Sequence, residues 1–512
     1  MFKFKSTFLP LAIVAVIQFS ACSSTQLHKQ IPQSKHQTVE ENIVLAMQKI
    51  PEVPGIAVSV YAEDFVFSKG FGITSVNTRE VTSGDTAFYI ASSTKSITAL
   101  AMANLHEKGV IDLDTSIASF APDAPFKPEI ETHEITLRHL LAQSSGIKNA
   151  PIAHRLAFTG NHTPSQLWDA LAFTENNQDE PRGSFKYSNY NFNILTLLTD
   201  KKLRRSWKDI VAKEIFDKAG MTRTTAYVSI ANANGWSMAR PHQLNVGGVS
   251  QIKLEKQDNT MQSAGGVLMS ANDAALWLEL LIEQGKVGMR QVLPAKAVLA
   301  TQKFETEVDK TFLGFKRKYY GLGFYGGQYG EKNDLMLHHF GSFAGSSSHI
   351  SYLPLKKVGV AIFTNEDAIG IRLASVLSRY IYSELANDAN ASNTLKKDIR
   401  QLAEQIVKRR EQLQHAKKRQ AERQYQLTQP LANYMGTYSN QLYGKITVGK
   451  SNEHLLVSSG NLSAVSTAYP KKDSVRIEMT PGTGQILSFK LDEGKEIESL
   501  NVSDVVYIKV IE

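Results

Sequence analysis

The chain has 512 residues, 42% of them apolar and 21% charged, which is the composition of a globular protein. At about 150 residues per domain, this length exceeds one compact core, so we expect two or three domains. The net charge is +8, and residues 395–424 hold ten Lys or Arg against four Asp or Glu. The rest of the chain is therefore close to neutral, which argues against nucleic acid as a partner.

Residues 1–22 are predicted to be a signal peptide, because two lysines precede an apolar stretch at 8–19 that is too short to span a bilayer. Cys22 is the only cysteine, which excludes an internal disulfide. Its position after small residues resembles a bacterial lipoprotein signal, in which the cysteine is lipidated and becomes the new N-terminus. Such signals usually have leucine where this chain has Phe19. The alternative is ordinary cleavage near Ala21, with Cys22 incidental.

The residues after Cys22 indicate where an exported protein would stay. Ser23 stands where an inner-membrane retention signal usually has aspartate, so the resemblance implies a lipoprotein of the outer membrane facing the periplasm. The lipidated N-terminus would make the membrane a partner. Residues 23–40 are polar and lack apolar periodicity, so they are predicted to be a tether.

Residues 41–390 mix helix and strand signals. Strands are expected in pairs at both ends of this segment, at 55–61 with 65–67 and at 350–353 with 358–363. Apolar helices are expected between and after them, at 96–108, 137–141, 273–284 and 371–385. This order predicts an α+β fold in which helices flank an antiparallel sheet built from both ends of the domain.

Two further segments follow. Residues 391–429 are predicted to form a basic connector helix, because apolar residues recur from 395 to 413 at helical spacing. That helix either packs on one domain or forms a coiled-coil seam, although fewer than three clean heptads support the seam. Residues 430–512 alternate apolar and polar positions between short turns, which predicts a small all-β, barrel-like domain.

The Ser-x-x-Lys spacing occurs three times, beginning at Ser92, Ser145 and Ser250. Only Ser92 opens a long apolar helix, which places its side chain and that of Lys95 on one face, one turn apart. The helix N-terminus adds positive electrostatic potential, which favours negative charge that develops at Ser92. A desolvated lysine with a lowered pKa can activate a serine hydroxyl, so Ser92 and Lys95 are the predicted nucleophile and base.

Two other signals bear on the chemistry. The neighbouring His338 and His339 lack the spacing of a His-Glu-x-x-His or Cys/His cluster, so we expect no metal and no cofactor. No Gly-x-Ser-x-Gly occurs, which argues against the nucleophile elbow of an α/β-hydrolase.

Three motifs in order carry a resemblance to a known family. Ser92-Ser93-Thr94-Lys95 is followed by Tyr187-Ser188-Asn189 and then by His339-Phe340-Gly341-Ser342. With flanking segments such as 137–146 and 263–270, residues 42–385 resemble the superfamily of class C β-lactamases and penicillin-binding proteins. The tail resembles the lipocalin-like domain that some of these relatives carry.

The resemblance implies a role for each motif residue. Ser92 would attack the carbonyl carbon, and Lys95 would accept the proton of the Ser92 hydroxyl. Tyr187 would act as a second acid–base group. Asn189, His339 and Gly341 would bind the substrate, with Asn189 holding an amide, and the N–H groups of Ser92 and Ser342 would hold the oxyanion.

Two of these residues raise chemical questions. To be half ionised at pH 7, Tyr187 would need a pKa about 3 units below its ordinary value. Many β-lactamases have lysine at the start of the third motif, where this chain has His339. Because imidazole is only about a quarter protonated at pH 7, the charge that helps to hold a β-lactam carboxylate would be mostly missing.

We therefore expect a serine hydrolase that acts through a Ser92 acyl-enzyme on amide or ester bonds of D-amino-acid peptides or small esters, and that is a weak β-lactamase at best. The alternative is a non-catalytic, penicillin-binding or receptor-like module of the same fold. The partner would be a small-molecule or peptide substrate, and the sequence leaves the oligomeric state open.

Overall fold

The computed structural model describes residues 33–511. Its larger part is built on one sheet of eight strands in the order β12-β13-β14-β15-β16-β17-β1-β2, and each neighbouring pair is antiparallel. The strands are β1 (Gly55–Ala62), β2 (Phe65–Gly72), β12 (Thr306–Phe312), β13 (Phe315–Tyr320), β14 (Tyr325–Tyr329), β15 (Asp334–Phe343), β16 (Ser346–Leu353) and β17 (Val358–Thr364). The predicted α+β sheet with strands from both ends of the domain is confirmed.

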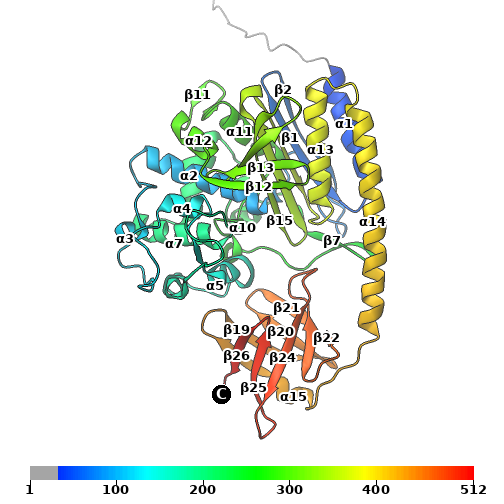
Figure 1. The fold of residues 1–512 in the computed structure, drawn as a ribbon. Helices are drawn as coiled ribbons and strands as arrows, with labels where there is room; N and C mark the ends of the chain where they lie inside the picture. The colour runs from blue at the N-terminus through cyan, green and yellow to red at the C-terminus, as the bar shows by residue number, and fades with distance from the viewer. Residues whose placement is uncertain (1–32, 512) are drawn as a thin grey trace, which may run out of the picture.

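Helices cover both faces of this sheet (Figure 1). Side chains alternate along its strands, so Val360 and Ile362 of β17 enter one core while Ala361 and Phe363 enter the other. The helices that pack in the first core are α1 (Gln33–Lys49), α13 (Gly370–Leu385) and α14 (Ala391–Ala421). The longer helices of the second core are α2 (Thr94–Glu107), α7 (Tyr190–Leu203), α11 (Ala271–Ile282) and α12 (Ala295–Gln302).

Shorter elements complete this α/β body. The helices are α3 (Ile117–Phe120), α4 (Leu137–Leu141), α5 (Ala150–His154), α6 (Pro164–Asp169), α8 (Trp207–Val211), α9 (Asp217–Ala219) and α10 (Val228–Ala233). The strands pair as β9 (Leu268–Met269) with both β3 (Phe88–Tyr89) and β6 (Thr224–Thr225), β4 (Ile147–Lys148) with β5 (Glu175–Asn176), β7 (His242–Asn245) with β8 (Gly248–Gln251), and β10 (Lys286–Val287) with β11 (Arg290–Gln291).

The N-terminal segment differs from its prediction as a tether. Helix α1 begins at Gln33, so the last eight residues of 23–40 are helical. Val39, Ile43 and Ala46 are fully buried and recur at helical spacing. Within 33–40 only Val39 contributes to this apolar face, so the sequence pattern was too short to reveal the helix. The predicted signal peptide and Cys22 lie outside the described residues.

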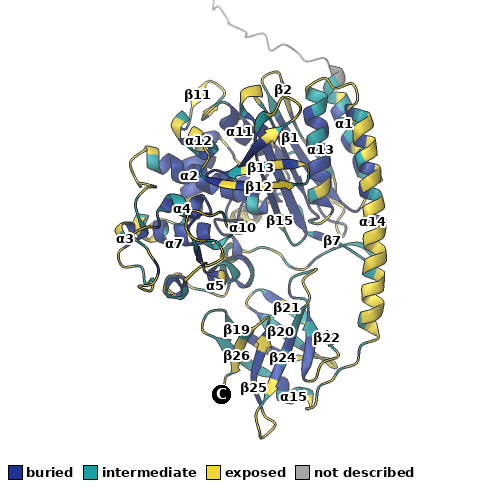
Figure 2. Cartoon of the chain, viewed as in Figure 1, coloured by how far each residue is buried: buried dark blue, intermediate teal, exposed yellow. Residues whose placement is uncertain are grey.

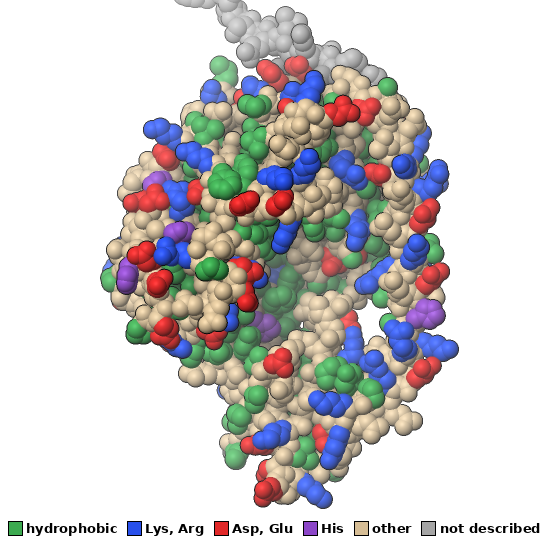
Figure 3. Space-filling view, viewed as in Figure 1, with side chains coloured by type: hydrophobic (Ala, Val, Ile, Leu, Met, Phe, Trp, Pro, Cys, Tyr) green, Lys and Arg blue, Asp and Glu red, His purple; other side chains and the backbone are tan. Residues whose placement is uncertain are grey.

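Helix α14 packs along the body rather than standing free. Leu395, Ile399, Leu402 and Ile406 are buried against α13 and α1. The following turns are largely exposed, and Figure 3 shows Lys and Arg side chains along this edge of the molecule. These contacts favour the packed connector over the coiled-coil seam. Within residues 33–511, none of the helices has both the length and the apolarity needed to cross a bilayer.

The C-terminal part is a sheet of nine strands in the order β21-β20-β19-β18-β26-β25-β24-β23-β22, preceded by α15 (Leu431–Tyr434). The strands are β18 (Gly436–Asn440), β19 (Gly444–Ser451), β20 (His454–Ser459), β21 (Leu462–Val465), β22 (Thr467–Ala468), β23 (Ser474–Ile477), β24 (Gln485–Leu491), β25 (Ile497–Val502) and β26 (Val505–Lys509). Pairing of β18 with β26 nearly closes the sheet into a barrel around its own core, and Figure 2 shows buried residues inside it. The predicted barrel-like domain is confirmed.

The barrel contacts the body along residues 155–159 and at Asn259, whose side-chain oxygen accepts a hydrogen bond from the Asn461 side chain at 3.1 Å. Arg155, at the start of the π-helical turn η2 (Arg155–Thr159), donates to the carbonyl oxygens of Leu442 at 2.6 Å and Gln441 at 3.0 Å. The Asn461 N–H donates to the Thr159 carbonyl at 2.8 Å. In Figure 3 the surface is hollowed where the two parts meet, and hydrophobic side chains line the recess.

Candidate active site

Ser92 lies in a single 3₁₀ turn, η1 (Ala91–Ser93), that runs directly into α2. Ala91 has a φ of +45°, in the left-handed region that strains a residue with a Cβ. The turn is held from β16, because the Ser348 hydroxyl donates to the Ile90 carbonyl at 2.6 Å. Ser92 is partly exposed between the buried Ala91 and Ser93. The strained turn therefore presents the Ser92 hydroxyl, and no local sequence signal identified Ala91.

Lys95 is fully buried one turn further along α2. Its Nζ lies 2.8 Å from both Asn189 Oδ1 and the Ala264 carbonyl oxygen, and 3.4 Å from Ser92 Oγ. Among the described residues, no carboxylate forms an ion pair with this amine. The sequence predicted that Ser92 and Lys95 share a face, and the structure brings Asn189 to the same amine.

The hydrogen-bond partners of Lys95 suit a neutral amine. Burial lowers the pKa of Lys95 well below its usual range, because the low-polarity interior disfavours the charged form. A neutral amine has two N–H donors and one lone pair. The two short contacts to Asn189 and Ala264 use both donors, which leaves the lone pair for the third neighbour, the Ser92 hydroxyl.

Tyr187 and Asn189 enter the site on the loop before α7. This loop is held by Gln143, whose side chain donates to the Ser188 carbonyl at 2.9 Å and accepts from the Ser188 N–H at 2.9 Å. The same side-chain oxygen accepts from Asn191 at 3.1 Å. Gln143 is thus a positioning residue. In the sequence it was visible only as part of the flanking segment 137–146.

The pKa of Tyr187 is raised, which disfavours ionisation of the phenol. Burial raises it well above its usual range, and the neighbouring Ser92 side chain opposes this more weakly. The ring lies 4.7 Å from Lys95 Nζ and 5.9 Å from the His339 ring. Tyr187 is therefore a neutral phenol, suited to donating or relaying a proton, and the downward pKa shift that half ionisation requires does not occur.

Strand β15 passes close to the nucleophile turn at Gly341. A Cβ there would overlap the Ile90 carbonyl oxygen and lie 2.9 Å from the Ser92 backbone nitrogen, so only glycine permits this approach. The β15–β16 hairpin closes at Phe343 opposite Ser346, and hydrogen-bonded pairs alternate with non-bonded ones. The N–H of Ser342 therefore points away from β16, as the predicted oxyanion site requires.

His339 is buried beside Tyr187. Its Nδ1 lies 2.7 Å from the Phe340 carbonyl, and its Nε2 has no partner. Burial lowers the pKa of His339 well below its usual range, and the nearby Arg317 guanidinium acts in the same direction. The imidazole is therefore neutral at pH 7, and this position carries even less positive charge than an exposed histidine would.

The two other Ser-x-x-Lys pairs lie away from this arrangement. Ser145 is buried and donates to Asn191 Oδ1 at 2.7 Å, whereas Lys148 is exposed and pairs with Glu175 at 3.1 Å. Ser250 lies on β8 and accepts a hydrogen bond from the Asn245 side chain at 2.6 Å.

A cavity of about 400 Å³ adjoins the end of β15 at Phe343 and is also lined by Tyr89 and Lys256. The Lys256 Nζ lies 3.5 Å from the centre of the Phe343 ring and donates to the Ala157 carbonyl at 2.5 Å. Burial lowers the pKa of Lys256 to about 7. Ala157 lies in the turn that docks the barrel, so Lys256 links the lining of this cavity to that turn.

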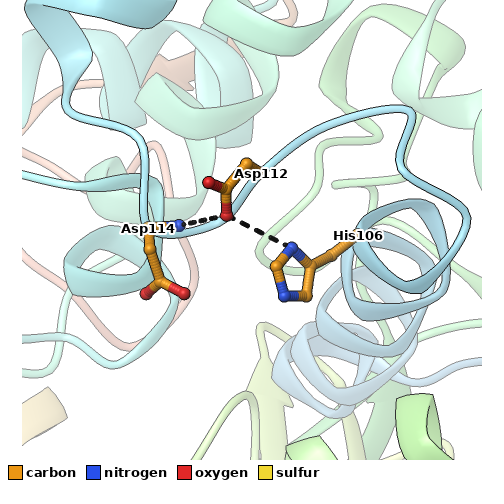
Figure 4. A group of neighbouring side chains, drawn as sticks. All are labelled: His106, Asp112 and Asp114. Carbon is orange, nitrogen blue, oxygen red and sulfur yellow. Dashed lines mark hydrogen bonds and ion pairs between the residues drawn. The ribbon is translucent and has the colours of Figure 1, made fainter.

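Within residues 33–511, one side-chain group has the geometry of a cation site, formed by His106, Asp112 and Asp114 (Figure 4). His106 Nδ1 lies 3.4 Å from Asp112 and accepts from the Leu113 N–H at 3.3 Å, while Asp114 pairs with Arg138 at 2.6 Å. These contacts close the turn after α2, at the end of the helix away from Ser92. The group has a structural role and takes no part in the site.

An antiparallel sheet between helical layers, with a Ser-x-x-Lys helix against its central strands, defines the fold of penicillin-recognising proteins. Residues 43–370 match the family described as Beta-lactamase. The chain belongs to this family.

Similar proteins agree with this assignment at low identity. "Protein flp" of Staphylococcus aureus is 22% identical over 319 residues, which are 61% of this chain and 60% of that protein. The chain thus spans about three fifths of the length of that curated relative. The octameric penicillin-binding protein homologue from Pyrococcus abyssi is 21% identical with a TM-score of 0.58, covering 92% of this chain and 99% of the other. The D-alanine carboxypeptidase AmpC from Burkholderia cenocepacia is 19% identical with a TM-score of 0.54, covering 69% and 99%. Both structures support the fold.

Proposed function

We propose that the chain is a serine hydrolase that cleaves amide or ester bonds of D-amino-acid peptides or small esters through an acyl-enzyme on Ser92. The observation that carries this proposal is the arrangement around Lys95. Its two N–H donors are satisfied at 2.8 Å by Asn189 and Ala264, and its lone pair is left for the Ser92 hydroxyl. Such an amine can take the serine proton without a separate charged partner.

The reaction then follows from these positions. Ser92 Oγ bonds the substrate carbonyl carbon while its proton passes to Lys95 Nζ. The N–H groups of Ser92 and Ser342 hold the negative carbonyl oxygen. The neutral Tyr187 hydroxyl gives its proton to the leaving nitrogen or oxygen and regains one from Lys95 as the scissile bond breaks. In the second half-reaction, water attacks the acyl-enzyme through the same steps and releases the acyl group.

The relatives support a peptide substrate, because one fold neighbour is named a D-alanine carboxypeptidase. The side chain of Asn189 faces Lys95 at the entrance to α7, where its amide N–H₂ would hold a substrate carbonyl. The chemistry also accommodates small esters, because they need only the nucleophile, the base and the oxyanion site.

Covalent labelling with a fluorescent fluorophosphonate tests the proposal. Ser92→Ala should abolish labelling, whereas Ser145→Ala and Ser250→Ala should keep it, because neither serine shares a site with a buried lysine. Labelling that survives in Ser92→Ala would refute the mechanism. A binding module without catalysis would label with a penicillin but release no product from D-alanyl peptides or p-nitrophenyl esters, so product release separates the two functions.

A further inference from the structure

A chain of three hydrogen bonds runs from α7 to the amine of Lys95. Asn193 Nδ2 donates to Gln262 Oε1 at 2.7 Å, and the same oxygen accepts from the Ala264 N–H at 2.7 Å. The Ala264 carbonyl oxygen then accepts from Lys95 Nζ at 2.8 Å. All four residues are buried, with exposed fractions between 0% and 5%. The position of the Ala264 carbonyl therefore depends on protein groups rather than on solvent.

The backbone fixes the orientation of both side-chain amides in this chain. A backbone N–H can only donate, so the Gln262 atom that faces the Ala264 N–H is the side-chain oxygen. That oxygen needs a donor on its other side, so Asn193 presents its NH₂ group to it. The Asn193 oxygen is left buried without a partner, which costs free energy. An unpaired oxygen at this position indicates that the donor of the asparagine has a role.

Gln262 holds both peptide groups that flank Ala264. Its side-chain oxygen accepts from the Ala264 N–H, and its carbonyl oxygen accepts from the Gly265 N–H at 2.9 Å. The second of these peptide groups carries the carbonyl to which Lys95 donates. The turn is tight, because a Cβ at Gly266 would overlap the backbone of Gln262. The direction of the Ala264 carbonyl thus depends on Gln262.

We propose that Asn193 and Gln262 are positioning residues for Lys95. They hold the Ala264 carbonyl so that it accepts one N–H of the amine, which leaves the lone pair for the Ser92 hydroxyl. This inference rests on the proposed function, because only a base needs that lone pair. Neither residue touches the reacting atoms, and the loss of either one should slow the transfer of the serine proton.

A cavity outside the site gives access to this chain of hydrogen bonds. It has a volume of about 760 Å³, and its lining includes Asn193, Gln262 and residues of α6, α7 and α8. Neither Ser92 nor Lys95 is among its lining residues. Truncation of Asn193 would open the vacated space to this cavity, so a small amide could enter that space without passing the nucleophile.

The test is chemical rescue of Asn193→Ala in the fluorophosphonate labelling assay. At a pH where Lys95 is neutral, the labelling rate constant should fall by about 10- to 100-fold, because a misplacement of about 1 Å can cost about 100-fold. Formamide, which replaces the lost amide group, should restore much of the rate. N,N-dimethylformamide, which has no N–H to donate, should not. A rate equal to that of the wild type, or equal rescue by both amides, would overturn the proposal.

Two further variants separate positioning from a general loss of stability. Gln262→Met keeps the length of the side chain but offers no acceptor to Ala264, so its rate should fall similarly and formamide should not rescue it. The matched control is Thr199→Val, a fully buried residue of α7 whose hydroxyl donates within the helix, to the Thr196 carbonyl at 3.3 Å. It should keep the wild-type rate. An equal loss of rate in Thr199→Val, at equal stability in thermal unfolding, would overturn the positioning role.

A measurement that needs no catalysis separates this proposal from the proposed function. In a Ser92→Ala background, Asn193→Ala should lower the pKa of Lys95, read from the NMR resonance of its Cε carbon, because a well-placed carbonyl acceptor favours the charged amine. Formamide should raise this pKa again. An unchanged pKa would overturn the positioning role even if Ser92 proves to be the nucleophile. Conversely, this pKa response together with labelling that survives in Ser92→Ala would overturn the hydrolase and leave the positioning role standing.

Discussion

The neutral state of Lys95 can be tested by one isosteric substitution, Asn189→Asp. It places a carboxylate where the amide oxygen now lies, 2.8 Å from Lys95 Nζ. Opposite charges about 4 Å apart interact by about 4 kcal/mol at an effective dielectric constant of 20. Since 1.36 kcal/mol corresponds to one unit, the pKa of Lys95 should rise by about three units.

The sign of the effect follows from the role of Lys95 as a base. Only the neutral amine accepts the serine proton, so the wild-type labelling rate should rise with pH up to the lowered pKa of Lys95 and then level off. In Asn189→Asp this inflection should move to higher pH by about three units. At a pH below both inflections, the two rate constants should differ by about 10³-fold.

The assay is the second-order rate constant of fluorophosphonate labelling between pH 5 and pH 10, because this probe needs no contact with the Asn189 amide. The matched control, Asn189→Ala, removes the hydrogen-bond acceptor without adding charge and should move the inflection by less than one unit. Thermal unfolding at each pH shows that both variants remain folded. If the inflection of Asn189→Asp coincides with that of the wild type, Lys95 is not the base.

Three further predictions concern substrate choice, attachment and stability. Because His339 is neutral, kcat/KM for nitrocefin should stay well below about 10⁷ M⁻¹s⁻¹ and below that for a D-alanyl peptide, and a value in that range would refute the argument from His339. We also propose that Cys22 is lipidated, so Cys22→Ser should move the protein from the membrane to the soluble periplasmic fraction or block its processing; a soluble wild type would contradict this. Burial raises the pKa of Glu366 to about 7, so the folded protein binds its proton more tightly than the unfolded chain, and stability should fall by up to about 3 kcal/mol between pH 4 and pH 7. Glu366→Gln, which keeps an oxygen to accept from the N–H groups of Ile369 and Gly370, should remove this loss in urea unfolding at pH 5 and pH 8; an unchanged pH dependence would exclude Glu366 as its source.

Local patterns in the sequence were sufficient for much of the architecture. The hairpin of β1 and β2, the hairpin of β16 and β17 and helix α4 all lie where the apolar periodicity placed them. The same holds for the pairing of Ser92 with Lys95, because two residues three apart on one helix must share a face. Such features depend on neighbours along the chain, which the sequence displays directly.

Only the tertiary structure decided the properties that depend on burial and on contacts between segments far apart in the sequence. Asn189 and Ala264 reach Lys95 from 94 and 169 residues away, and together they leave its lone pair for Ser92. The pKa of Tyr187 rises rather than falls, since removal from water opposes its ionisation more than nearby groups favour it. Folding also places the Arg317 guanidinium against the rings of Tyr325 and Phe312, which lie on other strands. A residue's charge state depends on everything packed around it, and that packing is formed by segments that are far apart in the sequence.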